Sequence, residues 1–158
     1  METLEVTSVK TEDYNISISK ELNAFLSDVQ IYNMNLRGLH WNIKGRNFFL
    51  LHEKYEELYN EADEMVDEIA ERILAIGSSP LHTFEDYLAN KNLEVAKQVS
   101  KGEEGVALVL GNLKHLLRKE REILEKAGEN SDEATANLVS DFISNQEKHI
   151  WMLESFLS

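Results

Sequence analysis

Residues 51–80 decide the fold, and they read LHEKYEELYNEADEMVDEIAERILAIGSSP. Apolar side chains recur here at every third or fourth position, which is the repeat of one face of an α-helix. The members of this apolar stripe are Leu51, Tyr55, Leu58, Ala62, Met65, Ile69, Ile73 and Ile76. Gly77 and Pro80 follow the stripe, and a glycine with a proline just beyond it is typical of a helix end. The stretch therefore predicts a long amphipathic helix.

The segment before residue 51 shows the same helical repeat. Its apolar side chains step by three, four or seven positions between residues 18 and 39. Ser17 or Ser19 is the predicted N-cap of this first helix, because a hydroxyl can accept a hydrogen bond from the free amides of the first turn. Gly45 and Asn47 are expected to break the chain before the next helix.

The segment after residue 80 predicts one short helix and two long ones. Residues 83–86 resemble the start of a short helix within an otherwise irregular crossover. Ser100 and Glu103 have the spacing of a capping box and open a third long helix, which Gly128 ends. Residues 131–133 then supply an N-cap and first-turn acids for a fourth long helix that runs to the end of the sequence.

These elements predict an all-α protein built as an antiparallel four-helix bundle. The first two and the last two long helices are joined by short connections, whereas about twenty-five residues separate the second from the third. The short helix lies in that long crossover. Residues 1–158 are expected to form a single domain, with residues 1–15 as a flexible N-terminal segment.

The composition favours cations over nucleic acids as partners. The 16 Lys and Arg residues face 29 Asp and Glu residues, so the formal net charge is −13 and the surface repels phosphate. The absence of Cys excludes disulfides, thiolate zinc sites and Cys nucleophiles. Residues 1–15 do not resemble a signal peptide, and no apolar run approaches the roughly 20 residues of a membrane span. A soluble, cytoplasmic protein without membrane contact is expected.

Four side chains on the 51–80 helix could bind a metal ion. His52 and Glu56 are one turn apart, as are Asp67 and Glu71, and all four share one side of the helix. The rise from His52 to Asp67 is ~22 Å at about 1.5 Å per residue, so a single ion cannot join both ends within one chain. Either the two pairs serve separate purposes, or the helix meets its symmetry mate and shares the ion across chains.

The sequence lacks the ligand pattern of a di-iron centre inside the bundle. None of the five histidines has a Glu three residues before it, so no Glu-x-x-His pair is present. Imidazole and carboxylate ligands without thiolates favour iron, manganese or zinc over softer metals. A bundle that handles iron would therefore do so outside its own core.

Four motifs together resemble the Dps family of mini-ferritins. They are LHWNIKG at 39–45, FFLLHEK at 48–54, DEIAER at 67–72 and KHIWML at 148–153. The resemblance spans nearly the whole chain and keeps the twelve-residue spacing from His40 to His52. It implies a ferritin-like fold assembled into a hollow dodecamer.

The resemblance also implies a ferroxidase activity. Members oxidise Fe(II), preferentially with hydrogen peroxide and also with oxygen, store the ferric mineral inside the shell, and so protect against oxidative stress. The di-iron site lies between subunits, so His40 and His52 would come from one subunit, and Asp67 and Glu71 from its mate. Glu56, where many members have Asp, is the fifth expected ligand.

Further residues receive roles from their neighbours or from the resemblance. Trp41 beside His40 is either a redox neighbour that quenches oxidising equivalents or a packing residue. The other candidates are acidic: Glu53 and Glu57 as mineral nucleation residues or a solvated face, and Asp132, Glu133 and Asp141 as acids of an ion-entry pore. Asn137, where many members have Asp, weakens that pore. His149 is expected to be a hydrogen-bonded structural residue, and His82 and His115 receive no role.

Two rival functions share the same sequence features. A metal-sequestering protein for zinc or manganese would use the same ligands without storing mineral. A helical interaction module would use the histidines structurally and the acids for solubility. Direct DNA binding is not expected, because Lys10 is the sole basic residue before Lys20 and no basic segment ends the sequence.

Overall fold

A computed structural model describes residues 2–158, with side chains from residue 11 onward. Five helices follow one another along the chain: α1 (Glu2–Asn42), α2 (Phe48–Ala75), α3 (Phe84–Asn90), α4 (Gly102–Glu129) and α5 (Glu133–Leu157). No helix in this part of the chain is long and apolar enough to cross a membrane.

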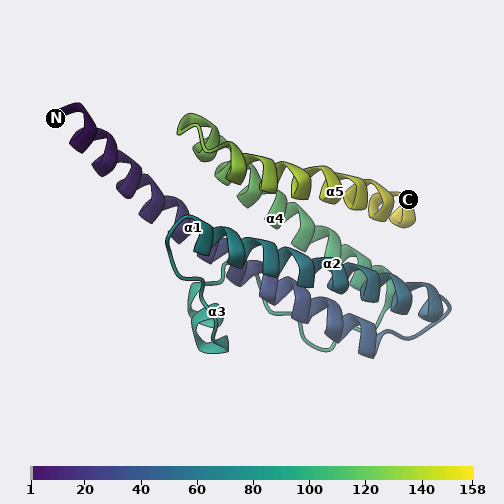
Figure 1. The fold of residues 1–158 in the computed structure, drawn as a ribbon. Coiled ribbons are helices and arrows are strands. Elements are labelled where there is room, and N and C mark those ends of the chain that lie inside the picture. Colours follow the sequence, from purple (N-terminus) through teal and green to yellow (C-terminus); the bar gives the residue numbers. More distant parts are fainter. Residues whose placement is uncertain (1) are drawn as a thin grey trace.

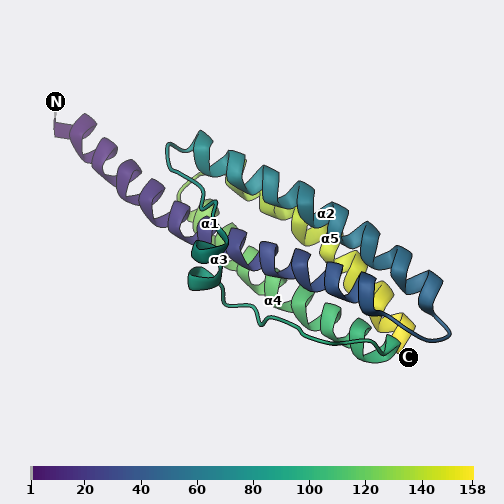
Figure 2. The ribbon, with the colours of Figure 1, turned by 90° about the horizontal axis from the view of Figure 1, so that it is seen from below.

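The four long helices form a bundle of two helical hairpins, α1 with α2 and α4 with α5 (Figures 1 and 2). α1 packs against α2, α3 and α4, so it lies at the centre of the contacts that join the hairpins. The crossover carrying α3 runs along the side of the bundle between the end of α2 and the start of α4 (Figure 2). The predicted architecture, including the short helix in the long crossover, is confirmed.

The predicted start of the first helix is wrong, because α1 already begins at Glu2. No glycine or proline interrupts residues 2–37, so nothing in the sequence breaks the helix there. Ser19 is buried, and the Ser17 hydroxyl accepts a hydrogen bond from the Lys126 ammonium group. Both serines therefore serve packing between helices rather than capping. The flexibility expected of residues 1–15 stays a prediction, and Met1 lies outside the described residues.

Two helix ends use the same hydrogen-bond motif with different residues. Gly77 has a φ of +85°, and the Gly77 and Ser78 amides bond back to Leu74 and Ile73, as the sequence predicted for a glycine stop. α4 instead ends at Glu129, one residue past the predicted Gly128, and the left-handed position falls on Ser131 with a φ of 56°. Only backbone bonds are needed for this motif, so the stop residue is not fixed by glycine alone.

The N-terminus of α4 also departs from the prediction. Lys101 is the N-cap and makes no side-chain capping bond, so the capping box expected from Ser100 and Glu103 is wrong. The Ser100 carbonyl instead accepts a hydrogen bond from the Lys44 amide at 2.9 Å, which ties the crossover to the α1–α2 loop. Thr83 and Asp132 do cap α3 and α5, since their side chains accept from the Asp86 and Thr135 amides.

Buried polar side chains hold the crossover in place. Asp28 of α1 is fully buried, and its Oδ1 accepts from the Asn92 and Leu93 amides at 2.6 and 2.8 Å. Its Oδ2 lies 2.7 Å from Nε2 of His115 on α4. One carboxylate thus joins α1, the crossover and α4, which satisfies backbone groups that an irregular buried segment would otherwise leave without partners.

Gly105 of α4 leaves room for the Tyr55 side chain of α2, and we expect Gly105→Ala to destabilise the protein by about 1–3 kcal/mol. A methyl group there would lie 2.6 Å from Oη of the fully buried Tyr55 and 3.3 Å from Leu39 Cδ2. Urea denaturation measures the change in unfolding free energy. In a Tyr55→Phe background the nearest ring atom, Cζ, is 3.6 Å away, so most of the cost should disappear.

The control for this prediction is Gly111→Ala on the same helix. Nothing lies within 4 Å of that position, so the better helix propensity of Ala should stabilise the protein by up to about 1 kcal/mol. An equal cost of Gly105→Ala with Tyr or Phe at position 55 would contradict the proposed clash.

Candidate metal centre

His40 and His52 face each other where α1 ends and α2 begins. Their rings stack with centroids 3.7 Å apart, and each Nδ1 hydrogen-bonds to the backbone carbonyl of the other residue, at 2.6 and 2.7 Å. A carbonyl only accepts hydrogen bonds, so both Nδ1 atoms carry the proton. In the neutral rings each Nε2 therefore keeps its lone pair, which is the tautomer a metal ligand needs.

Aromatic rings fix the orientation of this histidine pair. Phe48 stacks on His52 with centroids 5.0 Å apart, and Tyr59 meets His40 edge-on at 5.3 Å. The Arg37 guanidinium lies 4.1 Å from the centroid of the Tyr59 ring. The two imidazoles are thus held from both sides before any ion arrives, which lowers the ordering cost of binding.

Glu56 lies one turn after His52 and is exposed. Tyr59 donates a hydrogen bond to Glu56 Oε1 at 3.3 Å, which leaves Oε2 free to bind. Burial and the Glu56 carboxylate raise the pKa of Tyr59, so the phenol keeps its proton as a donor. Asp63, in contrast, is paired with Arg37 at 2.8 Å and accepts a hydrogen bond from Asn33. Both of its oxygens are therefore already engaged within the chain.

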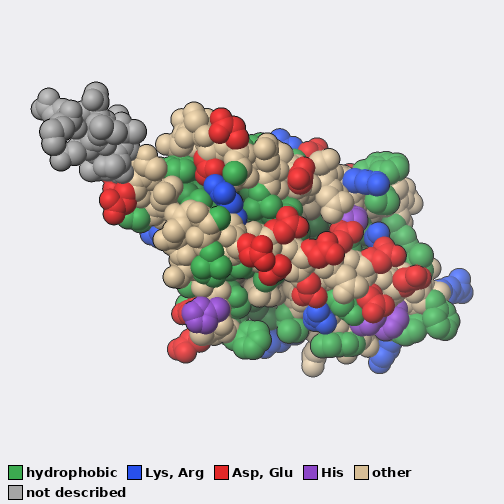
Figure 3. Space-filling view, viewed as in Figure 1, with side chains coloured by type: hydrophobic (Ala, Val, Ile, Leu, Met, Phe, Trp, Pro, Cys, Tyr) green, Lys and Arg blue, Asp and Glu red, His purple; other side chains and the backbone are tan. Residues whose placement is uncertain are grey.

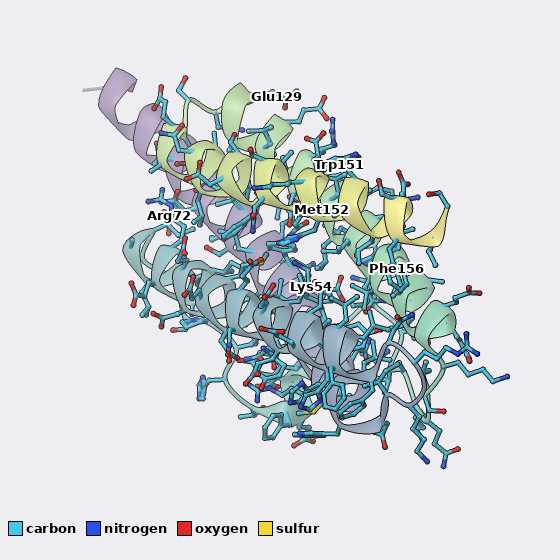
Figure 4. All side chains as sticks on the ribbon, turned by 90° about the vertical axis from the view of Figure 1, so that its right-hand side faces the viewer. Lys54, Arg72, Glu129, Trp151, Met152 and Phe156 are labelled. Carbon is cyan, nitrogen blue, oxygen red and sulfur yellow. The ribbon has the colours of Figure 1, made fainter. Side chains whose placement is uncertain are left out.

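Asp67 and Glu71 lie on the same unbroken helix as His52, and both are exposed. Figure 4 labels Lys54, two residues after His52, and Arg72, next to Glu71, near opposite ends of α2. Within the described part of the chain, no three or more His, Cys, Asp or Glu side chains are arranged to hold a metal ion. Within the described chain, neither the histidine pair nor the carboxylate pair belongs to a cluster of three such side chains.

The flanking candidates on α1 and α2 are exposed. Trp41 is 65% exposed beside His40. Figure 3 shows acidic side chains gathered over α2. Glu53 and Glu57 are exposed residues of this helix, and Glu57 pairs with Lys54 at 3.2 Å. These positions leave Trp41, Glu53 and Glu57 accessible from outside the chain.

The candidate pore acids differ in whether their carboxylates are engaged in hydrogen bonds and ion pairs within the chain. Both oxygens of Asp132 are used within the chain: Oδ1 accepts from Arg72 and the Thr135 amide, and Oδ2 accepts from Tyr14. Burial acts against ionisation of Asp132, but these bonds outweigh it and lower the pKa. Glu133 begins α5 and Asp141 lies two turns later, and both are exposed without an ion-pair partner in the described residues.

The remaining histidines have structural partners. His149 is buried and its Nε2 lies 2.6 Å from Glu61 Oε2, which confirms the expected hydrogen-bonded role. His115, to which the sequence assigned no role, bonds to Asp28, which is 87 positions away. Nothing local in the sequence signals that pair. His82 is exposed and makes only a local contact with the Pro80 carbonyl.

The arrangement can do one kind of chemistry. Imidazole nitrogens with a free lone pair and a carboxylate one turn away are ligand types that suit a borderline or hard divalent ion. Two helical hairpins joined by one long crossover are the architecture of ferritin-like proteins. Residues 19–158 match the family model of the ferritin-like domain.

Individual relatives narrow this class. The chain is 41% identical over 153 residues to the DNA protection during starvation protein of Porphyromonas gingivalis, covering 97% of this chain and 96% of the relative. It is also similar to the solved Dps of Vibrio cholerae, described as a member of a broad superfamily of ferritin-like diiron-carboxylate proteins. That match has a TM-score of 0.91, 39% identity and 92% coverage of both chains.

A Dps structure from Bacillus brevis is similar as well, with a TM-score of 0.90, 36% identity, and coverage of 92% of this chain and 98% of that one. The chain belongs to the Dps family, and the predicted ferritin-like fold is confirmed.

Proposed function

We propose that the protein is a ferroxidase that oxidises Fe(II), preferentially with hydrogen peroxide, and stores the ferric mineral in a hollow dodecamer. The observation that carries this proposal is the reciprocal bonding of His40 and His52, which leaves the lone pair of each Nε2 available to a metal ion. Membership of the Dps family supports iron as the metal.

The proposed site is completed by a second copy of the chain. His40, His52 and Glu56 of one subunit bind Fe(II) together with the Asp67 and Glu71 pair of its two-fold mate. A groove of about 320 Å³ between α1 and the crossover supports this contact. It is lined by exposed Met34, Phe84, Leu88 and Val95. Apolar side chains exposed together favour burial against a partner.

The chemistry at this site is a two-electron reduction of peroxide. Each of two Fe(II) ions gives up one electron, the O–O bond of hydrogen peroxide breaks, and two hydroxide ions form. The carboxylates stabilise the higher charge of Fe(III), while the imidazoles, fixed by their Nδ1 bonds, orient the ions. Paired electron transfer avoids the one-electron cleavage that would release hydroxyl radical. Trp41 is proposed as a quencher of stray oxidising equivalents.

Acidic residues would guide and retain the iron. Glu133 and Asp141 are the free acids for an entry pore near the start of α5, whereas Asp132 contributes its charge while bonded to Arg72. Glu53 and Glu57 are proposed to nucleate the mineral. With a net charge of −13 per chain, protection of DNA would come from removing Fe(II) and peroxide, not from phosphate contact. The protein would work in the cytoplasm.

Iron loading tests this proposal. Fe(II) is added anaerobically, substoichiometric hydrogen peroxide follows, and iron is measured across a size-exclusion profile with light scattering. We expect iron to elute with a particle of about twelve subunits, far beyond one ion pair per site. A parallel run with Zn(II) or Mn(II) distinguishes simple metal sequestration, which would stop at site stoichiometry. Precipitated iron beside a monomer or dimer peak would overturn the proposal.

A further inference from the structure

Tyr59 contacts one candidate metal ligand on each of two helices. Its hydroxyl donates a hydrogen bond to Glu56 Oε1 on α2 at 3.3 Å. Its ring meets the His40 ring of α1 at an angle of 87°, with the centroids 5.3 Å apart. Tyr59 is not one of the five proposed ligands, so it contacts the ligands without being one itself.

Side chains of α1 hold Tyr59 in place. Asn33 Nδ2 donates a hydrogen bond to the Tyr59 carbonyl at 3.0 Å, and the Arg37 guanidinium lies 4.1 Å from the ring centroid. The guanidinium is fixed in turn, because its Nε donates to Asn33 Oδ1 at 2.9 Å and it pairs with Asp63 at 2.8 Å. Asn33 is buried, so these contacts rest on the core of the α1–α2 hairpin. The Tyr59 ring therefore has a defined position before any ion arrives.

Glu56 has no such anchors of its own. It is exposed, and the bond from Tyr59 is its one hydrogen bond among the described residues. An unrestrained glutamate side chain samples many rotamers, and ordering it when a metal binds lowers the affinity. Tyr59 engages Oε1 and leaves Oε2 without a partner in that part of the chain. The hydrogen bond thus reduces the freedom of Glu56 and keeps one oxygen for a metal ion.

The kind of donor matters as well, because other acids of α2 are held by cations. Glu57 pairs with Lys54, and Asp63 pairs with Arg37. Each of those carboxylates has its charge offset by its partner. The Tyr59 hydroxyl is neutral, so Glu56 is restrained and still presents its full negative charge to a divalent ion.

We propose that Tyr59 is a positioning residue of the metal site, which orders Glu56 as a charged ligand with one free oxygen. This inference rests on the proposed ferroxidase site and assigns a role there to a residue outside the ligand set. Residues that hydrogen-bond to metal ligands typically contribute 10–100-fold to metal affinity. Tyr59 donates to one ligand of five, so loss of its hydroxyl should weaken metal binding by about tenfold.

Equilibrium dialysis with Co(II) tests the proposal, because it measures metal binding without an oxidant. The variant Tyr59→Phe removes the hydroxyl and keeps the ring that contacts His40 and Arg37, and we expect it to bind Co(II) about tenfold more weakly. The matched control is Tyr55→Phe on the same helix, since the Tyr55 hydroxyl has no hydrogen-bond partner. That variant should bind Co(II) like the wild type.

A double-mutant cycle with Glu56 separates positioning from a general structural role. In a Glu56→Ala background, Tyr59→Phe should have no further effect on Co(II) affinity, because the hydroxyl acts through Glu56. The same loss in both backgrounds would overturn the proposal, and so would an unchanged affinity of Tyr59→Phe alone. If the wild-type protein does not oxidise Fe(II), the ferroxidase proposal fails by itself, because the Co(II) cycle measures the role of Tyr59 in binding only.

Discussion

Two inactive variants should regain ferroxidase activity when their chains are mixed in one assembly. The first variant is His40→Ala with His52→Ala, and the second is Asp67→Asn with Glu71→Gln. Each alone should lose about two orders of magnitude or more in the rate of Fe(II) oxidation by peroxide, because each lacks half of every site. Mixing pairs the intact histidines of one chain with the intact carboxylates of the other.

The size of the recovery follows from two-fold symmetry. With random pairing, half of the pairs contain one chain of each kind, and one of the two sites in such a pair is intact. About a quarter of the wild-type sites should therefore return. Co-expression of the two variants with different affinity tags, sequential purification and stopped-flow iron oxidation would measure it. No recovery in verified mixed assemblies would place the working ligands within one chain.

The bundle could be predicted from the sequence because its signals are local. The stripe over residues 51–76 and the Gly77 stop are patterns of neighbouring positions, and α2 ends at Ala75 as they indicate. The errors fell at helix ends. Ser17 accepts a hydrogen bond from Lys126, which is 109 positions away, and the Ser100 carbonyl accepts one from the Lys44 amide. These tertiary contacts, which local capping rules do not include, determine the roles of the two serines.

The candidate site was only partly visible for the same reason. The histidine and carboxylate spacings on one helix indicate a shared metal, since helical geometry fixes which residues lie on one side. The reciprocal Nδ1 bonds of His40 and His52 depend on how two helix ends meet. Tyr59 contacts His40 from a different helix, and no sequence period encodes that contact.

Glu120 marks another limit of sequence reading. It lies in α4 among exposed charges in the sequence, yet it is fully buried and both of its carboxyl oxygens lack hydrogen-bond partners. Its position at the core-facing side of α4 could be read from the helical period, but the charge argues for the surface. Only the packed bundle shows that an acid occupies the core.

Glu120 should make the protein less stable as the pH rises. Burial raises its pKa to about 9, against an ordinary value of 4.5. The folded state therefore keeps a proton that the unfolded chain releases. Below pH 4.5 both the folded and the unfolded state hold this proton, and the stability that it confers is fully present. Between pH 4.5 and 9 the free energy of unfolding falls by about 1.4 kcal/mol per pH unit.

The variant Glu120→Gln should remove that loss, because Gln has nearly the same shape and no proton to release. At pH 7 the free energy of unfolding of this variant should exceed that of the wild type by up to about 3 kcal/mol. Urea denaturation at several pH values between 5 and 9, at one fixed protein concentration, measures both slopes. Glu104→Gln, at an exposed position of the same helix, serves as the control and should keep the wild-type slope.

Other groups around Glu120 set the background against which its slope is measured. Tyr32 of α1 stays protonated over this range, because burial and the charges of Glu61 and Glu120 raise its pKa. The pKa of Glu61 is lowered, since its bonds to His149 and Asn145 outweigh its burial, so it stays ionised. Both groups are therefore constant between pH 5 and 9. A slope that survives unchanged in Glu120→Gln would mean that Glu120 is already ionised in the folded bundle, with a cation or water compensating its charge.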